Sequence, residues 1–143
     1  MIIVTSIPPS LRGKPFFASC LSSSLQEQAL ASWQQAGLKV LSLHGQSESD
    51  AFPSHADELR KANIIPFIID QRDPGPLPNL HSSLVALYRA YPDEVFAITN
   101  ADIVFSQPLL IYQFLAALSP HQLLIGRRTN VHDLSEVANP CYF

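Results

Sequence analysis

Asp102 and Asn100 are the residues whose type and position could most readily do chemistry. They follow the apolar run Val95 to Ile98, which predicts a buried strand ending in a polar turn. In open α/β sheets, ligands bind beyond the carboxyl ends of the strands. A carboxylate at that place can hold a divalent cation and, through it, a phosphate. The alternative is an ordinary turn, because Asn and Asp side chains bond to nearby backbone and tolerate unusual dihedral angles.

Polar side chains also follow the other apolar runs, in segments 6–12, 44–48, 70–73 and 127–130. If these runs are parallel strands, their polar ends converge on one crevice. The resulting mixture of hydroxyls, carboxylates and guanidinium groups suits a phosphorylated ligand with a divalent cation. Arg127 and Arg128 could clamp a diphosphate through bidentate hydrogen bonds, or they could be the solvated end of a strand. His132 and Asp133 could supply a metal ligand and a base, but a surface loop pair is the favoured interpretation.

The elements that would position these residues alternate between short apolar strands and longer helical patterns. Strands are predicted at 2–6, 38–43, 64–69, 94–99 and 121–126. Helices are predicted at about 17–36, 54–62, 79–91 and 109–118. This order predicts an α/β fold, namely a three-layer α/β/α domain with a mostly parallel sheet of about five strands.

Several local signals refine this arrangement. Gly37 is expected to end the first helix, and Pro66 favours an edge position for its strand because it lacks a backbone donor. Ser106 is expected to cap the last helix, so Asp102 is not needed for that role. Segment 45–50 is polar and is expected to be a loop. Trp33 lies on the apolar stripe of the first helix and is expected in the core.

The bulk composition excludes several classes of partner. The chain has 143 residues, which suits a single domain spanning 1–143. Its formal net charge is -3 and it has no basic stripe, so nucleic acid is not an expected partner. Two widely separated cysteines suit reduced thiols in a cytoplasmic protein. The opening apolar run is too short for a membrane span, and no Gly-rich phosphate loop is present, which argues against an ATP or dinucleotide fold.

The chain resembles a known family in its order of elements and in two segments. Thr5-Ser6-Ile7 follows the first strand and Asn100-Ala101-Asp102 follows the fourth. This pattern is similar to the nucleotide-binding half of nucleotide-diphospho-sugar transferases of the glycosyltransferase A fold, in particular those like family 2. That family carries an Asp-x-Asp type signature after the fourth strand, and Asn-x-Asp is a relaxed form of it.

The resemblance implies a site and a cofactor. Asp102 would bind Mn²⁺ or Mg²⁺, Asn100 would contact the ribose or a metal-bound water, and Thr5 to Ile7 would border the base and ribose. The complete set of candidate residues for the nucleotide-sugar is Thr5, Ser6, Ile7, Arg12, Asp70, Arg72, Asn100, Ala101, Asp102, Arg127 and Arg128.

These observations predict a metal-assisted glycosyltransferase that transfers a sugar from a nucleotide-diphosphate donor to an acceptor. The catalytic base has no candidate, and the acceptor-binding half that such enzymes possess is expected to be missing after Phe143. One alternative is a non-catalytic domain of the same fold that serves binding or assembly. Another is a nucleotidyltransferase, although the first loop lacks the basic, Gly-rich character expected of one.

Overall fold

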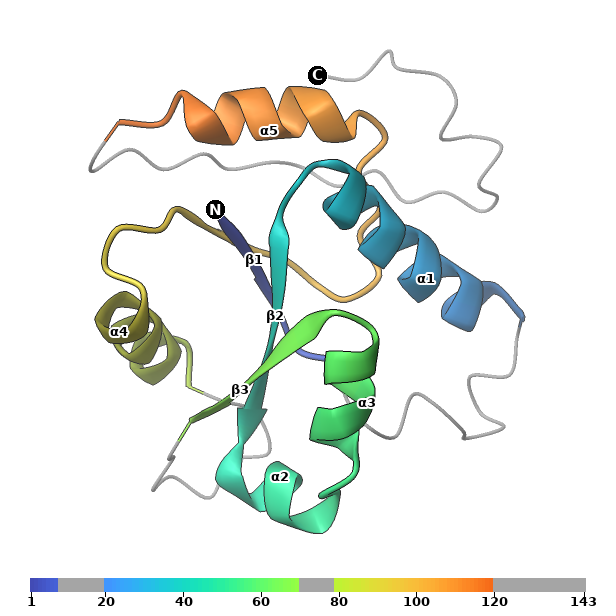
Figure 1. Ribbon diagram of the computed structural model, residues 1–143, viewed down its shortest axis with the longest axis vertical. Helices are drawn as coiled ribbons and strands as arrows, with labels where there is room; N and C mark the ends of the chain where they lie inside the picture. The colour runs from blue at the N-terminus through green and yellow to red at the C-terminus, as the bar shows by residue number, and fades with distance from the viewer. Residues whose placement is uncertain (8–19, 70–78, 120–143) are drawn as a thin grey trace.

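The computed structural model describes residues 1–7, 20–69 and 79–119. Their framework is a four-stranded sheet in the order β3-β2-β1-β4 (Figure 1). The strands are β1 (Ile2–Thr5), β2 (Lys39–Gly45), β3 (Ile64–Ile69) and β4 (Phe96–Ile98). Every pairing is parallel, so all four strands end at the same edge of the sheet.

Helices connect the strands and pack on the sheet. They are α1 (Cys20–Gln35), α2 (Gln46–Ala51), α3 (His55–Lys61), α4 (Leu80–Ala90) and α5 (Pro108–Ala116). Figure 1 shows α1 and α3 on one side of the strands and α4 on the other. This placement follows from right-handed crossovers, because the chain moves from β1 to β3 in one direction and then reverses to reach β4.

The side chains of the sheet alternate between two apolar clusters, as the period of two in a strand requires. Ile3 and Val40 face α1, α3 and α5, where Trp33 is the largest fully buried side chain. Ile2, Val4 and Leu41 point the other way and pack with Leu87 of α4. β1 and most of β2 are covered on both faces, which explains why these strands are continuous apolar runs rather than alternating ones.

The structure confirms the α/β class and the mostly parallel sheet at this coarse level. The first four predicted strands and all four predicted helices are present, with boundaries shifted by a few residues. The fifth predicted strand, at 121–126, lies outside the described residues. Pro66 is on the edge strand β3, as predicted. Gly37 follows α1 with a φ of 72°, the left-handed conformation expected of a helix-ending glycine.

Two local predictions were wrong. Segment 45–50 is not a loop, because Gln46 to Ala51 forms α2, in which the Gln46 side chain donates a 2.7 Å hydrogen bond to Asp50. The helix has no buried residue and therefore no apolar periodicity to reveal it. Ser106 does not cap α5: the N-cap is Gln107, which makes no side-chain cap bond, and Pro108 occupies the first turn. The preorganised φ of proline is a sufficient start signal there.

None of the helices among the described residues is long and apolar enough to cross a membrane.

Candidate functional site

The candidate site lies where the direction of strand order reverses. From β1 the chain proceeds outward through β2 to β3 and then returns to add β4 on the other side of β1. Such a switch point opens a crevice outside the carboxyl ends of the two central strands, and ligands bind there in open α/β sheets. The two segments singled out by sequence, 5–7 and 100–102, follow β1 and β4 and so flank this point. The backbone N–H of Thr99 donates a 3.0 Å bond to the carbonyl of Val4, which keeps the two strand ends side by side.

The first flank is the end of β1. Thr5 is the last residue of the strand and is 3% exposed, with no hydrogen-bond partner for its hydroxyl among the described residues. Ser6 and Ile7 continue the chain and are half-buried. Thr5 is paired in register with Ser42 of β2, so both side chains lie on the sheet face that packs α1 and α3.

Side chains from two other elements fix the backbone of Ile7. Its N–H donates a 2.9 Å hydrogen bond to the hydroxyl of Ser42. Its carbonyl accepts a 2.8 Å hydrogen bond from Nε2 of His55, the first residue of α3. These two bonds hold the exit of the chain from β1 in one conformation, which is a requirement for a preorganised binding loop.

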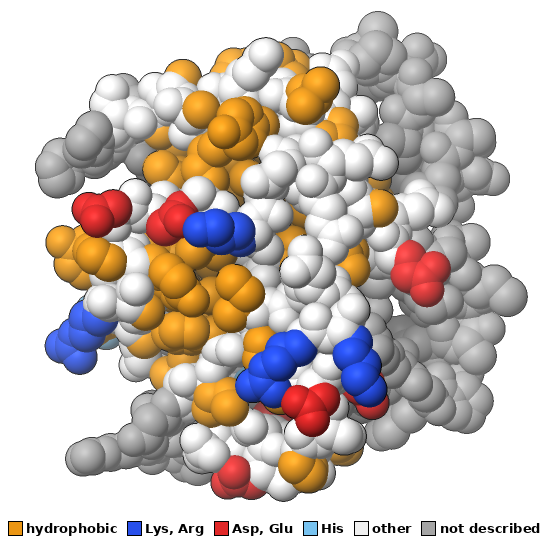
Figure 2. Space-filling view, viewed as in Figure 1, with side chains coloured by type: hydrophobic (Ala, Val, Ile, Leu, Met, Phe, Trp, Pro, Cys, Tyr) orange, Lys and Arg blue, Asp and Glu red, His pale blue; other side chains and the backbone are white. Residues whose placement is uncertain are grey.

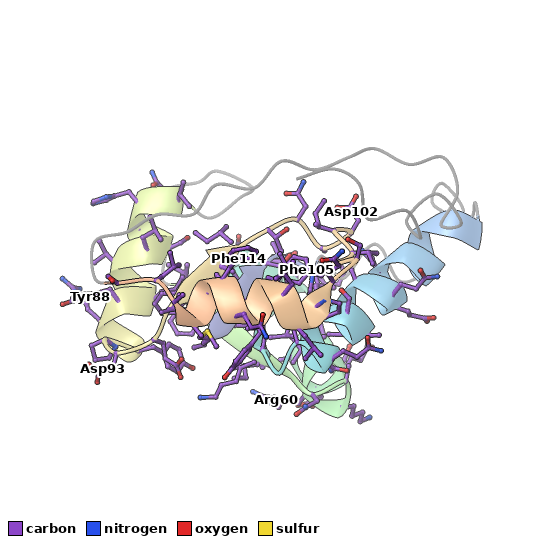
Figure 3. The ribbon with its side chains drawn as sticks, turned by 90° about the horizontal axis from the view of Figure 1, so that it is seen from above. Arg60, Tyr88, Asp93, Asp102, Phe105 and Phe114 are labelled. Atoms are coloured by element: carbon purple, nitrogen blue, oxygen red, sulfur yellow. The ribbon has the colours of Figure 1, made fainter. Side chains whose placement is uncertain are left out.

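The second flank is the turn after β4. Asn100 and Asp102 are exposed and Ala101 is half-buried, while the N–H of Ile103 closes the turn with a 3.4 Å bond to the carbonyl of Asn100. Figure 3 shows Asp102 in the turn that leads into α5, on the α1 side of the molecule and away from α4. The Asp102 carboxylate is therefore accessible to a ligand arriving from solvent.

Two hydrogen bonds from α1 anchor this turn. Trp33 Nε1 donates to the carbonyl of Ile103 at 2.9 Å. The Ser32 hydroxyl accepts from the N–H of Phe105 at 3.0 Å and donates to the carbonyl of Ala29 at 2.7 Å. The Trp33 and Phe105 rings also pack, with centroids 6.4 Å apart. The predicted core position of Trp33 is confirmed. Its hydrogen bond to Ile103 was not predicted, because periodicity cannot reveal a contact between residues so far apart in the sequence.

The donor set of the turn is limited for a cation. Within the part of the chain that the structure describes, no group of three or more His, Cys, Asp or Glu side chains could hold a metal ion. Asp102 and Asn100 supply a carboxylate and an amide oxygen, which are hard ligands. Mg²⁺ commonly binds through one or two carboxylates plus substrate phosphates and water. These two groups would leave the remaining coordination positions of a cation to other ligands.

Sequence reasoning missed a buried polar cluster at the end of β2. His44 and His55 are 3% and 6% exposed, and their rings meet edge to face with centroids 5.1 Å apart. Nδ1 of His44 lies 3.1 Å from the carboxylate of Glu48. Burial lowers the pKa of His44, an effect that the Glu48 hydrogen bond and charge partly oppose. Because the two histidines lie on different elements, no sequence spacing links them.

A second charged cluster lies at the opposite edge of the sheet. Glu94 accepts hydrogen bonds from the amino group of Met1 and, at 2.9 Å, from Lys39. These partners lower the pKa of the Glu94 carboxyl, with the Met1 hydrogen bond as the largest cause. Because this cluster joins the start of β1 to the approach to β4, it stabilises the pairing that forms the switch point.

The remaining candidate residues, Arg12, Asp70, Arg72, Arg127 and Arg128, lie outside the described residues, so the structure does not bring them to the site or separate them from it.

Comparison with known proteins gives no relatives. No protein-family model matches the chain, no curated protein is significantly similar to it, and no solved structure matches it significantly.

Proposed function

We propose that the chain is the nucleotide-binding domain of a metal-assisted glycosyltransferase that uses a nucleotide-diphosphate sugar. The complete fold in this proposal is a three-layer α/β/α domain of glycosyltransferase A type, in which 121–126 adds a fifth strand.

The observation that carries the proposal is the pairing of β1 with β4. It places the ends of these strands, and thus Thr5 to Ile7 and Asn100 to Asp102, on either side of one switch point. A ligand can span both flanks. Its nucleoside can contact backbone and hydroxyl groups, and its phosphates can lie near the Asp102 carboxylate. Nucleotide-sugars have this extended, two-part form.

The proposed reaction forms one bond and breaks one. An acceptor hydroxyl attacks the anomeric carbon of the donor sugar, the bond from that carbon to the diphosphate oxygen breaks, and the nucleoside diphosphate leaves with the electron pair. The hydroxyl proton passes to a base. Among the described residues near the switch point, the proposed role is binding and orientation of the donor, and no base is assigned.

Asp102 is the proposed protein ligand for Mn²⁺ or Mg²⁺, with Asn100 beside it. When bound there, the cation would neutralise charge on the leaving diphosphate. The chain's own contribution is to fix the turn, through the bonds of Trp33 and Ser32 to its backbone. Bonds that fix the backbone of the turn reduce the entropy cost of ordering that backbone on binding.

A non-catalytic assembly domain is the second candidate, favoured by exposed apolar side chains. Leu80, Leu84 and Tyr88 recur along α4 at helical spacing and are 60%, 42% and 67% exposed. Figure 2 shows hydrophobic side chains gathered between α4 and the strands β2 and β3. Apolar surface of this kind often marks a protein contact. A nucleotidyltransferase has no such supporting observation.

Isothermal titration of uridine diphosphate, with and without Mn²⁺, tests the proposal. Saturable binding that strengthens when Mn²⁺ is present supports a nucleotide-sugar site. If millimolar uridine diphosphate with Mn²⁺ produces no binding, the glycosyltransferase proposal fails and the assembly candidate remains. Size measurement by light scattering then tests that candidate, which requires self-association or a stable partner complex.

A further inference from the structure

The His44 and His55 pair carries a pattern of hydrogen bonds that the proposed glycosyl transfer does not use. Each ring has one nitrogen engaged by an acceptor: Nδ1 of His44 by the Glu48 carboxylate at 3.1 Å, and Nε2 of His55 by the Ile7 carbonyl at 2.8 Å. Since a carbonyl only accepts, Nε2 of His55 carries its proton. The carboxylate likewise fixes the proton of neutral His44 on Nδ1.

These tautomers leave one unprotonated nitrogen on each ring. Nε2 of His44 and Nδ1 of His55 are buried, and neither has a hydrogen-bond partner among the described residues. Buried polar atoms without a partner are rare in native proteins and call for an explanation. Each atom presents a lone pair, which is the form in which imidazole binds a metal ion.

The outer contacts are those found around metal-binding histidines. Such residues almost always donate their second ring N–H to a carboxylate or a backbone carbonyl, which fixes the tautomer and raises the basicity of the ligand nitrogen. His44 has the carboxylate and His55 has the carbonyl. Glu48 acts through His44 in this arrangement and is not itself a ligand.

The spacing and setting of the rings fit one small ion. Two imidazoles on one tetrahedral ion, with metal–nitrogen distances of about 2.0–2.1 Å, place their ring centroids roughly 5 Å apart. The observed separation is 5.1 Å. A small pocket of about 10 Å³ adjoins the pair, with His44, Glu48 and His55 in its wall. The pocket is partly open to solvent and is too small for an organic ligand.

We propose that His44 Nε2 and His55 Nδ1 bind one divalent transition-metal ion of the Zn²⁺ class, with water completing its coordination. Imidazole nitrogens suit Zn²⁺, Co²⁺, Ni²⁺ and Cu²⁺, whereas Mg²⁺ and Mn²⁺ prefer oxygen ligands. This site is therefore distinct in both position and metal from the one proposed at Asp102. Because His55 also holds the Ile7 carbonyl, the ion would tie α3 to β2 and to the end of β1.

The test titrates Zn²⁺ alone into the full chain by calorimetry at neutral pH, alongside long-range proton–nitrogen spectra of the histidine rings. We expect micromolar binding, with Nε2 of His44 and Nδ1 of His55 as the ring nitrogens that shift. His44→Asn keeps a donor for Glu48 at the Nδ1 position, and His55→Gln keeps a donor for Ile7 at the Nε2 position. Each variant removes the proposed ligand nitrogen while it retains the outer hydrogen-bond donor, and it should weaken this binding at least tenfold.

Two further variants separate the site from incidental binding. Glu48→Gln should weaken Zn²⁺ binding by about 10- to 100-fold, as the loss of an outer-contact group does. His81→Gln, at an exposed histidine of α4, should leave the affinity unchanged. The proposal is overturned if the His44 and His55 ring nitrogens of the unmodified chain do not shift with Zn²⁺. The proposal is also overturned if His44→Asn and His55→Gln fold and bind Zn²⁺ with the same affinity as the unmodified chain.

Discussion

The indole Nε1 of Trp33 donates a 2.9 Å hydrogen bond to the carbonyl oxygen of Ile103, although the residues are 70 positions apart in the sequence. Trp33 is also the largest fully buried side chain of the core. The same residue thus joins the interior of the domain to the turn that carries Asp102. The position of the candidate carboxylate consequently depends on core packing as well as on the local sequence of the turn.

Trp33→Phe should destabilise the protein by about 1–3 kcal/mol, because it shrinks a core side chain and leaves the Ile103 carbonyl without its donor. Urea unfolding measures this change. Amide hydrogen exchange should also accelerate in segment 100–105. Phe105→Leu is the control, because it removes the ring contact with Trp33 but keeps the hydrogen bond from Trp33 Nε1 to the Ile103 carbonyl. Amide exchange in segment 100–105 should therefore accelerate less in Phe105→Leu than in Trp33→Phe. Equal acceleration in both variants would contradict the role given to the indole.

Ser32→Ala should cost about 0.5–1.5 kcal/mol in the free energy of unfolding, since the Phe105 N–H loses its acceptor. The Ala29 carbonyl keeps its place within α1, so the helix itself should survive. Circular dichroism measures whether the helix is retained, and urea unfolding measures the change in the free energy of unfolding. Ser32→Thr retains a hydroxyl and should recover much of the loss. If it is no more stable than Ser32→Ala, the hydroxyl is not the relevant group.

Gly37→Ala should destabilise the chain by about 1–2 kcal/mol, the cost of a left-handed conformation for a residue with a β-carbon. The strain comes from the backbone φ of 72°, because an added β-carbon would meet only Tyr112 at an ordinary 3.9 Å. Gly37→Asn should cost less, since asparagine tolerates this region better than alanine. Thermal unfolding ranks the three proteins, and an alanine variant as stable as the parent would contradict the assignment.

Glu94→Gln should change how stability depends on acid pH. The pKa of Glu94 in the folded protein lies below its ordinary value of 4.5. The ionised carboxylate therefore contributes to the free energy of unfolding above pH 4.5, and this contribution is lost as the pH falls through the lower pKa of the folded state. The variant should therefore be less stable at neutral pH, by about 0.2–1 kcal/mol for a partly exposed pair. Urea unfolding across pH should show this difference shrinking below pH 4.5. A difference independent of pH would contradict the ionic role.

The sequence allowed the main elements to be predicted because their signals are local. The run Ile2 to Val4 and the stripe that includes Trp33 reflect burial on one or both faces, and Gly37 and Pro66 each have a backbone reason for their place. That the strand ends share one edge followed from a general rule about parallel sheets, whereas the adjacency of β1 and β4 was not predicted. Helix α2 escaped prediction because it buries no residue, so no apolar pattern marks it.

The long-range polar contacts could not be predicted from the sequence. His44 and His55 lie on a strand and a helix separated by α2, and no spacing rule brings their rings together. The bond from His55 to Ile7 joins residues 48 positions apart. Hydrogen bonds of this kind depend on the final packing of the helices, and a single sequence carries no local signal for them.

The most direct test of the central claim compares the chain with Asp102→Asn by titrating uridine diphosphate in the presence and absence of Mn²⁺. Asp102 is exposed and lies in a turn fixed by backbone bonds, so the substitution should leave the fold intact by circular dichroism. We predict that Mn²⁺ strengthens nucleotide binding to the unmodified chain and that this enhancement disappears in Asp102→Asn. Enhancement that survives unchanged in Asp102→Asn would show that Asp102 is a turn residue and not a metal ligand.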